Sequence, residues 1–353
     1  MHRVTTVRPH RKSWTGVSSF VAALSVAVLV ASCGSSATGG DSDDEAINWY
    51  VSIPVAGAQP VADAFTKETG IPVTVQRLGT FELWQRFQTE NAAGRNVADV
   101  LSIASWDLLQ QAKQDKLIAP FIPDPVELGD EYGSTYVDPD GYAFVTRVLV
   151  ISISYNTKLV PEDKVPNEWD DLLDPYWRGK VAALDPREDA AGYDAYWQMA
   201  NDPAIDMGFF ERLRDQQPVL SGDSGAILNG LVSGEYHAAI TFDHTTWEQV
   251  SKGAPLAVTY PTSGLGNSLD YNTLVAKAPH PDAAKRFLRY LSGSDAANTL
   301  SEALFVYSPR PDVTPLPEER PRLTDVNLLQ RDPEAQAKDF DSFNDTFDSA
   351  MGR

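Results

Sequence analysis

The sequence predicts an α/β protein made of two units in which short strands and helices alternate. Residues 47–113 show the first alternation, and residues 169–260 repeat it. Two longer β-rich runs, 145–155 and 268–276, stand between and after these stretches, where each could cross from one unit to the other. Alternation at such short spacing is typical of parallel βαβ units.

In the first stretch, the pattern of apolar residues separates strands from helices. Phe81, Trp84 and Phe87 recur every three residues, as on one face of a helix, and Gly70 is a typical helix C-terminus. Strands are predicted at 47–53, 71–75 and 97–103, and helices at 60–69, 81–91 and 106–113.

The second stretch and the residues after it continue in the same way. Strands are predicted at 181–184, 219–220, 237–242 and 257–260, and helices at 169–173, 190–199, 225–232, 281–291 and 295–303. The proline-rich run 309–321 is expected to lie on the surface. Phe340, Phe343 and Phe347 form an apolar stripe on a last helix, which we expect to dock on the body.

Composition and charge exclude several classes of protein. The 353 residues are 42% hydrophobic and 22% charged, which is typical of a globular protein with about two domains and not of a disordered or collagen-like chain. The first 33 residues hold four basic residues and no acid, so the remainder carries 25 basic against 49 acidic residues. Such a body repels phosphate backbones, and we expect no nucleic-acid partner.

The N-terminal residues have the pattern of a targeting signal. A basic segment, 1–12, precedes an apolar run, 17–31, that is too short for a mature transmembrane helix. The small residues before Cys33 complete an order that resembles a bacterial lipoprotein signal peptide (1–33), in which the cysteine is acylated and becomes the mature N-terminus. The alternative is a plain secretory signal cut near the same place.

Cys33 is the only cysteine, so the chain forms no internal disulfide and no thiolate metal cluster. Residues 34–46 are rich in Gly, Ser and Asp and read as a flexible tether. We therefore expect a body held on the extracytoplasmic face of the cell membrane by a lipid anchor at Cys33.

Several phrases resemble those of extracellular solute-binding proteins, the binding components of ATP-driven (ABC) importers. The resemblance covers residues 47–310 and rests on the number and order of the phrases. They are FTKETGIPV at 65–73, ADV at 98–100, YNT at 155–157, WDDLLDPYWRGKV at 169–181, GE at 234–235 and HPDAAKRFL at 280–288.

The resemblance implies a two-lobed periplasmic-binding-protein-like fold of type II, with the ligand in a cleft between the lobes. Lobe 1 would comprise 47–150 and 268–353 (with the C-terminal tail), and lobe 2 would comprise 151–267. It also implies a monomer that captures a small polar solute and delivers it to an importer permease, without catalysis and without a cofactor. Hinge closure around the ligand is a recognised conformational mechanism.

The solute would be an amine, a zwitterion or an organophosphate. In the polyamine-like branch of the family, carboxylates pair with ammonium groups, and Asp185, Asp243 and Asp270 fall near the corresponding positions. Trp106 and Trp247 would supply aromatic walls. Arg147 lies inside an apolar run, where a charge must be paired or face the cleft. It either clamps an anionic group of the ligand or pairs with an acid across the hinge.

Other residues suit an anion. Ser224 opens a predicted helix whose N-terminal amides suit a phosphate group, with Asp223 interpreted as the helix cap. Ser52 in the first strand, and His244 and Thr245 after the strand at 237–242, complete the candidate ligand contacts.

A ferric-ion-binding protein of the same fold is the nearest alternative. The ferric branch uses two adjacent tyrosines where this sequence has Thr245 and Thr246, so the typical ferric site is missing and no metal site is expected. Tyr193 and Tyr196 could substitute, but a packed aromatic pair explains them more simply.

Two further classes stay open. Residues 222–225 match the GDSG phrase of chymotrypsin-like proteases, and a secreted hydrolase of another fold order would pair Ser224 with His244. A ligand sensor could use the same two-lobed fold with a signalling partner.

Overall fold

The computed structural model describes residues 46–123 and 135–353, all of which belong to one compact unit, Asp41–Arg353. The predicted signal peptide, almost all of the tether and the acylation site Cys33 lie outside the described residues. Among the helices of the described residues, none is long and apolar enough to cross a membrane.

The described strands form one hydrogen-bonded sheet in the order β2-β1-β3-β10-β5-β8-β6-β7, with β4 beside β10 and β9 beside β5. The bounds are β1 Ile47–Val51, β2 Val73–Arg77, β3 Val100–Ile103, β4 Ile118–Ala119, β5 Phe144–Asn156, β6 Val181–Leu184, β7 Val219–Ser221, β8 Ala238–Phe242, β9 Leu256–Thr259 and β10 Asn267–Val275. The four pairs β1/β2, β1/β3, β6/β7 and β6/β8 are parallel, as predicted for βαβ units.

The helices follow the strands in the predicted alternation. They are α1 Val55–Thr69, α2 Thr80–Ala92, α3 Trp106–Gln114, α6 Ala190–Asn201, α7 Asp206–Leu213, α8 Ser224–Ser233, α9 Asp243–Ser251, α10 Pro281–Ser292, α11 Ser294–Leu304 and α12 Pro333–Met351. Short 3₁₀ helices occupy Glu162–Lys164, Trp169–Leu173, Pro175–Trp177, Arg214–Gln216 and Leu323–Asp325. The prediction missed α7 and α9, and its start for α1 was wrong because that helix begins at Val55 and takes Pro60 into its interior.

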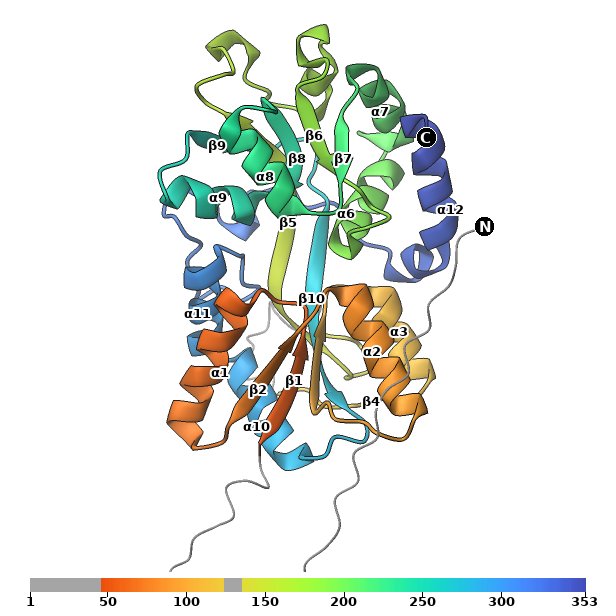
Figure 1. Cartoon of the computed structure of the whole chain (residues 1–353), viewed down its shortest axis with the longest axis vertical. Coiled ribbons are helices and arrows are strands. Elements are labelled where there is room, and N and C mark those ends of the chain that lie inside the picture. Colours follow the sequence, from red (N-terminus) through yellow and green to blue (C-terminus); the bar gives the residue numbers. More distant parts are fainter. Residues whose placement is uncertain (1–45, 124–134) are drawn as a thin grey trace, which may run out of the picture. The chain divides into compact units, whose positions relative to one another are not determined.

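Strands β5 and β10 connect two lobes (Figure 1). The first lobe contains β1 to β4 with α1, α2, α3, α10 and α11, and the second contains β6 to β9 with α6 to α9. Strand β5 pairs with β10 over residues 144–150 and with β8 and β9 over residues 151–156. The two-lobed α/β fold of type II is thereby confirmed, and the two runs predicted to cross between the units are these two strands.

The lobe boundaries inferred from the sequence stay a prediction. Helix α12 comes after the elements of both lobes in the sequence, and it packs on α7 and α6 of the second lobe and on α3 of the first. The run 309–321 is only partly on the surface, because Val313 and Arg320 are buried.

The core explains why the central strands read as nearly continuous apolar runs. Helices cover both faces of the sheet, so β3, β6 and β8 are buried along their whole length. Phe287 of α10 packs edge-to-face on Trp49 and Phe65, with each pair of ring centroids 5.0 Å apart. Such aromatic pairs fix α1 and α10 on the first lobe's sheet.

The start of β10 lies directly against α6, at Gly266. A Cβ atom at this position would stand 2.3 Å from the carbonyl oxygen of Ala195, so the backbone of one element must move. We expect Gly266→Ala to lower the free energy of unfolding by about 1–3 kcal/mol, the usual cost of overpacking. Urea unfolding measures this, with Gly79→Ala as control because nothing lies within 4 Å of a Cβ there. Equal stability of the two variants would contradict the prediction.

Candidate functional site

A cavity of about 450 Å³ lies where the carboxyl ends of strands from both lobes meet. Ser52 follows β1, Arg77 ends β2, and Ala104 follows β3 on the first-lobe side. Gly222 follows β7 and Phe242 ends β8 on the second-lobe side, while β5 contributes Arg147 and Leu149. Crevices outside the carboxyl ends of strands are the usual ligand sites of α/β sheets.

Five helices begin at the cavity. The lining residues include Pro54 before α1, Gly79 before α2, Asp189 before α6, Ser224 at the start of α8 and His244 in the first turn of α9. Each helix N-terminus carries a partial positive charge, although Asp189 and Asp223 cap some of the first-turn amides of α6 and α8. Their convergence makes the cavity a place where an anion is stabilised by backbone groups.

Two arginines add positive charge to the lining. Arg77 is exposed and has no ion pair among the described residues. Arg147 is buried and its Nε bonds Asp270 Oδ2, its direct partner across the β5/β10 ladder. Two roles were predicted for Arg147, pairing with an acid and clamping an anionic group of the ligand. The pairing is present, and Arg147 also lines the cavity.

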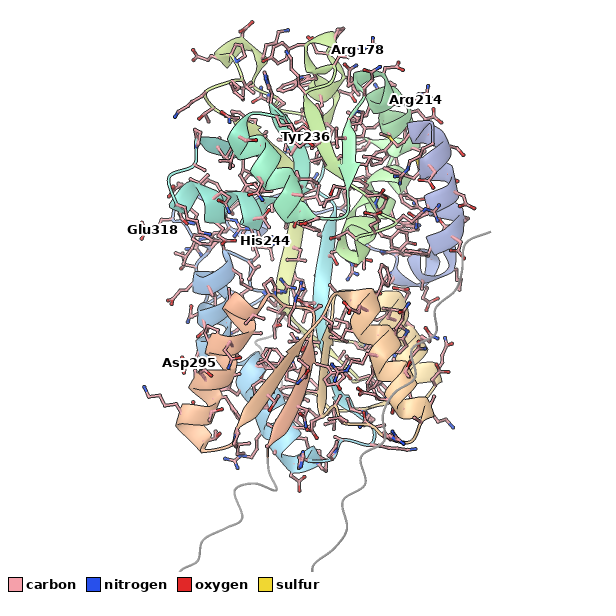
Figure 2. The ribbon with its side chains drawn as sticks, in the orientation of Figure 1. Arg178, Arg214, Tyr236, His244, Asp295 and Glu318 are labelled. Carbon is pink, nitrogen blue, oxygen red and sulfur yellow. The ribbon has the colours of Figure 1, made fainter. Side chains whose placement is uncertain are left out.

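His244 brings an imidazole to the cavity wall from the start of α9 (Figure 2). It is 9% exposed, and its Nδ1 has no hydrogen-bond partner among the described residues. Burial holds its pKa well below the ordinary value, and the charges of Arg147 and Arg320 lower the pKa further. The ring is therefore neutral at pH 7 and keeps an unpaired nitrogen near the lining.

Carboxylates occupy another part of the lining. Glu188 accepts a hydrogen bond from the amide of Gly222 at 3.2 Å, and Glu82 is exposed in the first turn of α2. Asp189 caps α6 through the amide of Gly192, and burial raises its pKa to about 6. The cavity thus offers groups for both signs of charge.

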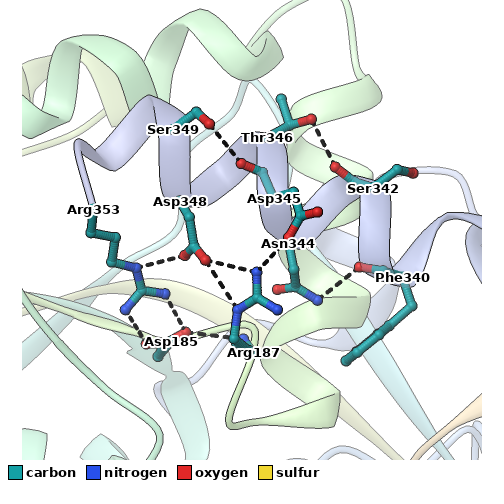
Figure 3. A network of polar contacts seen from close by, with 10 residues as sticks. All are labelled: Asp185, Arg187, Phe340, Ser342, Asn344, Asp345, Thr346, Asp348, Ser349 and Arg353. Carbon is teal, nitrogen blue, oxygen red and sulfur yellow. Dashed lines mark hydrogen bonds and ion pairs between the residues drawn. The ribbon is translucent and has the colours of Figure 1, made fainter.

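The three predicted acidic ligand contacts lie outside the lining and are each paired with an arginine. Asp185 receives two bonds from Arg353, at 2.5 and 2.8 Å, in the network shown in Figure 3. Asp243 is fully buried and receives two from Arg320, at 3.0 and 2.6 Å. Asp270 pairs with Arg147 and accepts a long bond from Ser52 Oγ. Each of these negative charges is already compensated within the protein.

The predicted aromatic walls also lie outside the lining. Trp106 packs against Tyr271, and Trp247 donates its Nε1–H to the hydroxyl of Tyr260. The lining does include the other predicted contacts, namely Ser52, Arg147, Ser224, His244 and Thr245. Whether any of them touches a solute stays a prediction.

The structure shows the surroundings of several residues for which the sequence left alternatives open. Asp223 Oδ1 accepts bonds from the amides of Gly225 and Ala226, so its interpretation as the cap of α8 is confirmed. Tyr196 is buried between Phe210 and Phe347, as expected of a packed aromatic. Within the described ranges, no group of three His, Cys, Asp or Glu side chains is placed to hold a metal ion.

Arg77, Gly79 and Glu188 line the cavity but were not predicted from the sequence. Their signal was positional, because Arg77 ends a strand and Gly79 and Glu188 lie between a strand and the next helix. In parallel α/β units those connections all reach the same edge of the sheet.

Comparison with known proteins places the chain in a family. The model of the family "bacterial extracellular solute-binding protein" matches residues 55–305. The chain is 26% identical to the spermidine/putrescine-binding periplasmic protein 1 of Haemophilus influenzae, over 69% of each chain. It is 27% identical to a putative 2-aminoethylphosphonate-binding periplasmic protein of Salmonella typhimurium, over 72% of this chain and 75% of the relative.

Among solved structures, iron-bound HitA from Pseudomonas aeruginosa has the same fold. The TM-score is 0.69 at 17% identity, and the match covers 86% of this chain and 99% of HitA. Together with the cavity between two α/β lobes, the family match over most of the chain establishes that this protein belongs to the bacterial extracellular solute-binding proteins.

Proposed function

We propose that the protein captures a small zwitterion that carries a phosphonate or phosphate group together with an amine, and delivers it to the permease of an ABC importer. The observation that carries the proposal is the convergence of five helix N-termini with Arg77 and Arg147 around one cavity. Backbone amides and guanidinium groups are the usual partners of phosphate oxygens.

The acidic part of the lining supports the amine. Glu188 and Glu82 have no ion pair among the described residues, and both lie at the cavity that the arginines enter. An amine held by Glu188 would stand near the start of α8, with the anionic group toward Arg147. The Salmonella relative is named for 2-aminoethylphosphonate, a solute that carries both an amine and a phosphonate group.

A polyamine is a weaker candidate for this cavity. A polyamine needs several unpaired carboxylates and aromatic walls, whereas Asp185, Asp243 and Asp270 each hold an arginine. Ferric ion needs hard anionic oxygens, and the lining has Thr245 where the ferric branch has tyrosine.

Further parts of the proposal concern the protein's setting. We propose a monomer anchored by lipid at Cys33 on the extracytoplasmic face of the membrane, with lobes divided at residues 150 and 267. We also propose binding without turnover. The protease-like phrase at Ser224 serves as a capped helix start. Phosphorus NMR would monitor the solute during prolonged incubation, and loss of intact solute would favour the hydrolase instead.

Calorimetric titration tests the solute class. The ligands are 2-aminoethylphosphonate, ethylphosphonate, spermidine and ferric citrate. We expect 2-aminoethylphosphonate to bind most tightly and ethylphosphonate about 10–100-fold more weakly, because it lacks one charge-assisted hydrogen bond. At about 100 times its dissociation constant, the better ligand should add about 2.7 kcal/mol to the free energy of unfolding.

Variants make the test specific to the amine contact. Glu188→Gln should remove the difference between the two phosphonates, while Glu235→Gln, exposed on the second lobe away from the lining, should keep it. Binding of spermidine alone would overturn the anionic site, and binding of ferric citrate alone would favour the ferric alternative. If none of the four ligands binds, the alternative that the protein is a ligand sensor gains support.

A further inference from the structure

Helix α12 lies outside the residues that the family model matches and packs on both lobes. In Figure 1 it runs beside α7 and α6 and reaches down to α3. Its contacts with the two lobes differ in kind and in extent. The difference determines which lobe α12 would follow if the lobes move about β5 and β10.

On the second lobe, α12 is held by buried rings and by charges. The rings of Phe343 and Phe347 lie 5.4 Å from Tyr193 and 5.2 Å from Phe210, respectively. Trp197 of α6 donates its Nε1–H to Asp339 at 2.9 Å. These contacts come from both α6 and α7, so α12 is built into the second lobe.

A polar network adds to this attachment (Figure 3). Arg187, three residues after the end of β6, bonds Asp348 at 2.7 Å and Asp345 at 3.0 Å. Arg353 joins Asp348 to Asp185 from the other side. The network fixes the C-terminal end of α12 to the loop that leads into α6.

Besides its packing on α3, α12 reaches the first lobe through Phe340. Its ring centroid lies 4.8 Å from that of Tyr193 in α6 and 5.9 Å from that of Phe81 in α2, and both pairs are close to perpendicular. Phe81 itself lines the cavity. The ring of Phe340 therefore bridges the two lobes at the rim of the cavity.

We propose that Phe340 is a latch between the lobes: α12 moves with the second lobe, and opening of the cavity must break the contact between Phe340 and Phe81. The latch favours the arrangement with the lobes together before any solute arrives. This goes beyond the proposed function, because it applies to the protein alone and holds for any solute.

The expected size of the effect follows from the contact. An edge-to-face aromatic pair changes an equilibrium by about two- to tenfold beyond the area it buries. Loss of the pair should shift the ratio of open to closed molecules by this factor. A cavity that is preorganised in the closed arrangement binds its solute more tightly. Loss of the ring pair should therefore make solute dissociation faster by a similar factor.

Distances between spin labels test the latch without a solute. Labels at Gln85→Cys on α2 and Asn229→Cys on α8 would report the separation of the lobes, since both positions are exposed. The full chain with Cys33→Ser provides a background without other cysteines. In Phe340→Ala the distance distribution should broaden toward longer distances.

Phe343→Ala is the matched control, because its ring pairs with those of Tyr193 and Phe347 and, among the described residues, with no ring of the first lobe. Both variants lose a ring from the packing of α12, so both should melt at a lower temperature, and only Phe340→Ala should change the distance. Phe340→Leu replaces it if the alanine variant does not fold. The same distribution in the Phe340 and Phe343 variants would overturn the latch, whether or not the protein binds a phosphonate.

Discussion

Arg147→Ala is expected to lower the free energy of unfolding by about 3–5 kcal/mol and to abolish solute binding. The side chain of Asp270 is fully buried, and Arg147 is the cation that compensates its charge. Removing one partner of a buried pair leaves an uncompensated charge, which costs far more than the pair contributes. Urea unfolding measures the stability, and titration with 2-aminoethylphosphonate measures the binding.

A second variant separates the two effects of Arg147. The double variant Arg147→Met with Asp270→Asn removes both charges and should recover most of the stability, while binding stays lost. Arg178→Ala, on the exposed surface of the second lobe, should change neither. A double variant that binds as well as the native protein would show that the guanidinium of Arg147 has no part in capture.

Asp194 is expected to lower the free energy of unfolding as the pH rises between about 4 and 7. Burial raises its pKa from the ordinary 3.8 to about 7, although the charge of Arg331 lowers the pKa in part. In this range the folded protein keeps a proton that the unfolded chain has released, so rising pH favours unfolding. One proton contributes a slope of about 1.4 kcal/mol per pH unit.

Asp194→Asn tests this slope. Asparagine resembles the protonated acid, so the variant should gain stability relative to the native protein as the pH rises from about 5 to about 8. His244 acts in the opposite direction, since its lowered pKa makes the folded state less stable below its ordinary value of 6.5, and its contribution cancels in the comparison. A variant that is less stable by the same amount at both pH values would show that Asp194 stays ionised beside Arg331.

Local patterns were sufficient to predict most of the elements. The runs predicted at 145–155 and 268–276 became β5 and β10, and both are buried along almost their whole length. The polar side chains of β10 are buried with hydrogen-bond partners, as Ser268 is with Asp194 and Asn272 with Thr146. Helix α7 was missed, since its first residue, Asp206, has a positive φ of 55° and follows a loop without a helix cap. Such a start leaves no signal in the sequence pattern.

For the candidate site, the sequence predicted which residues reach the cavity from strand ends, but not how the charged side chains pair. Ser224 and His244 follow strands, and strand ends meet at one edge of the sheet, so both reach the cavity. The roles of Asp185 and Asp243 were not predictable, because their arginine partners lie 168 and 77 positions further along the chain. No periodicity connects residues at such separations.

The pairing of Asp243 with Arg320 has a consequence for the order of folding. All strands of the second lobe lie before residue 260, yet the counter-charge of the fully buried Asp243 comes from Arg320, much later in the sequence. Arg353 stands in the same relation to Asp185, at the far end of α12. The second lobe therefore cannot complete its folding as an isolated segment, and its last step is the docking of the C-terminal residues that carry these arginines.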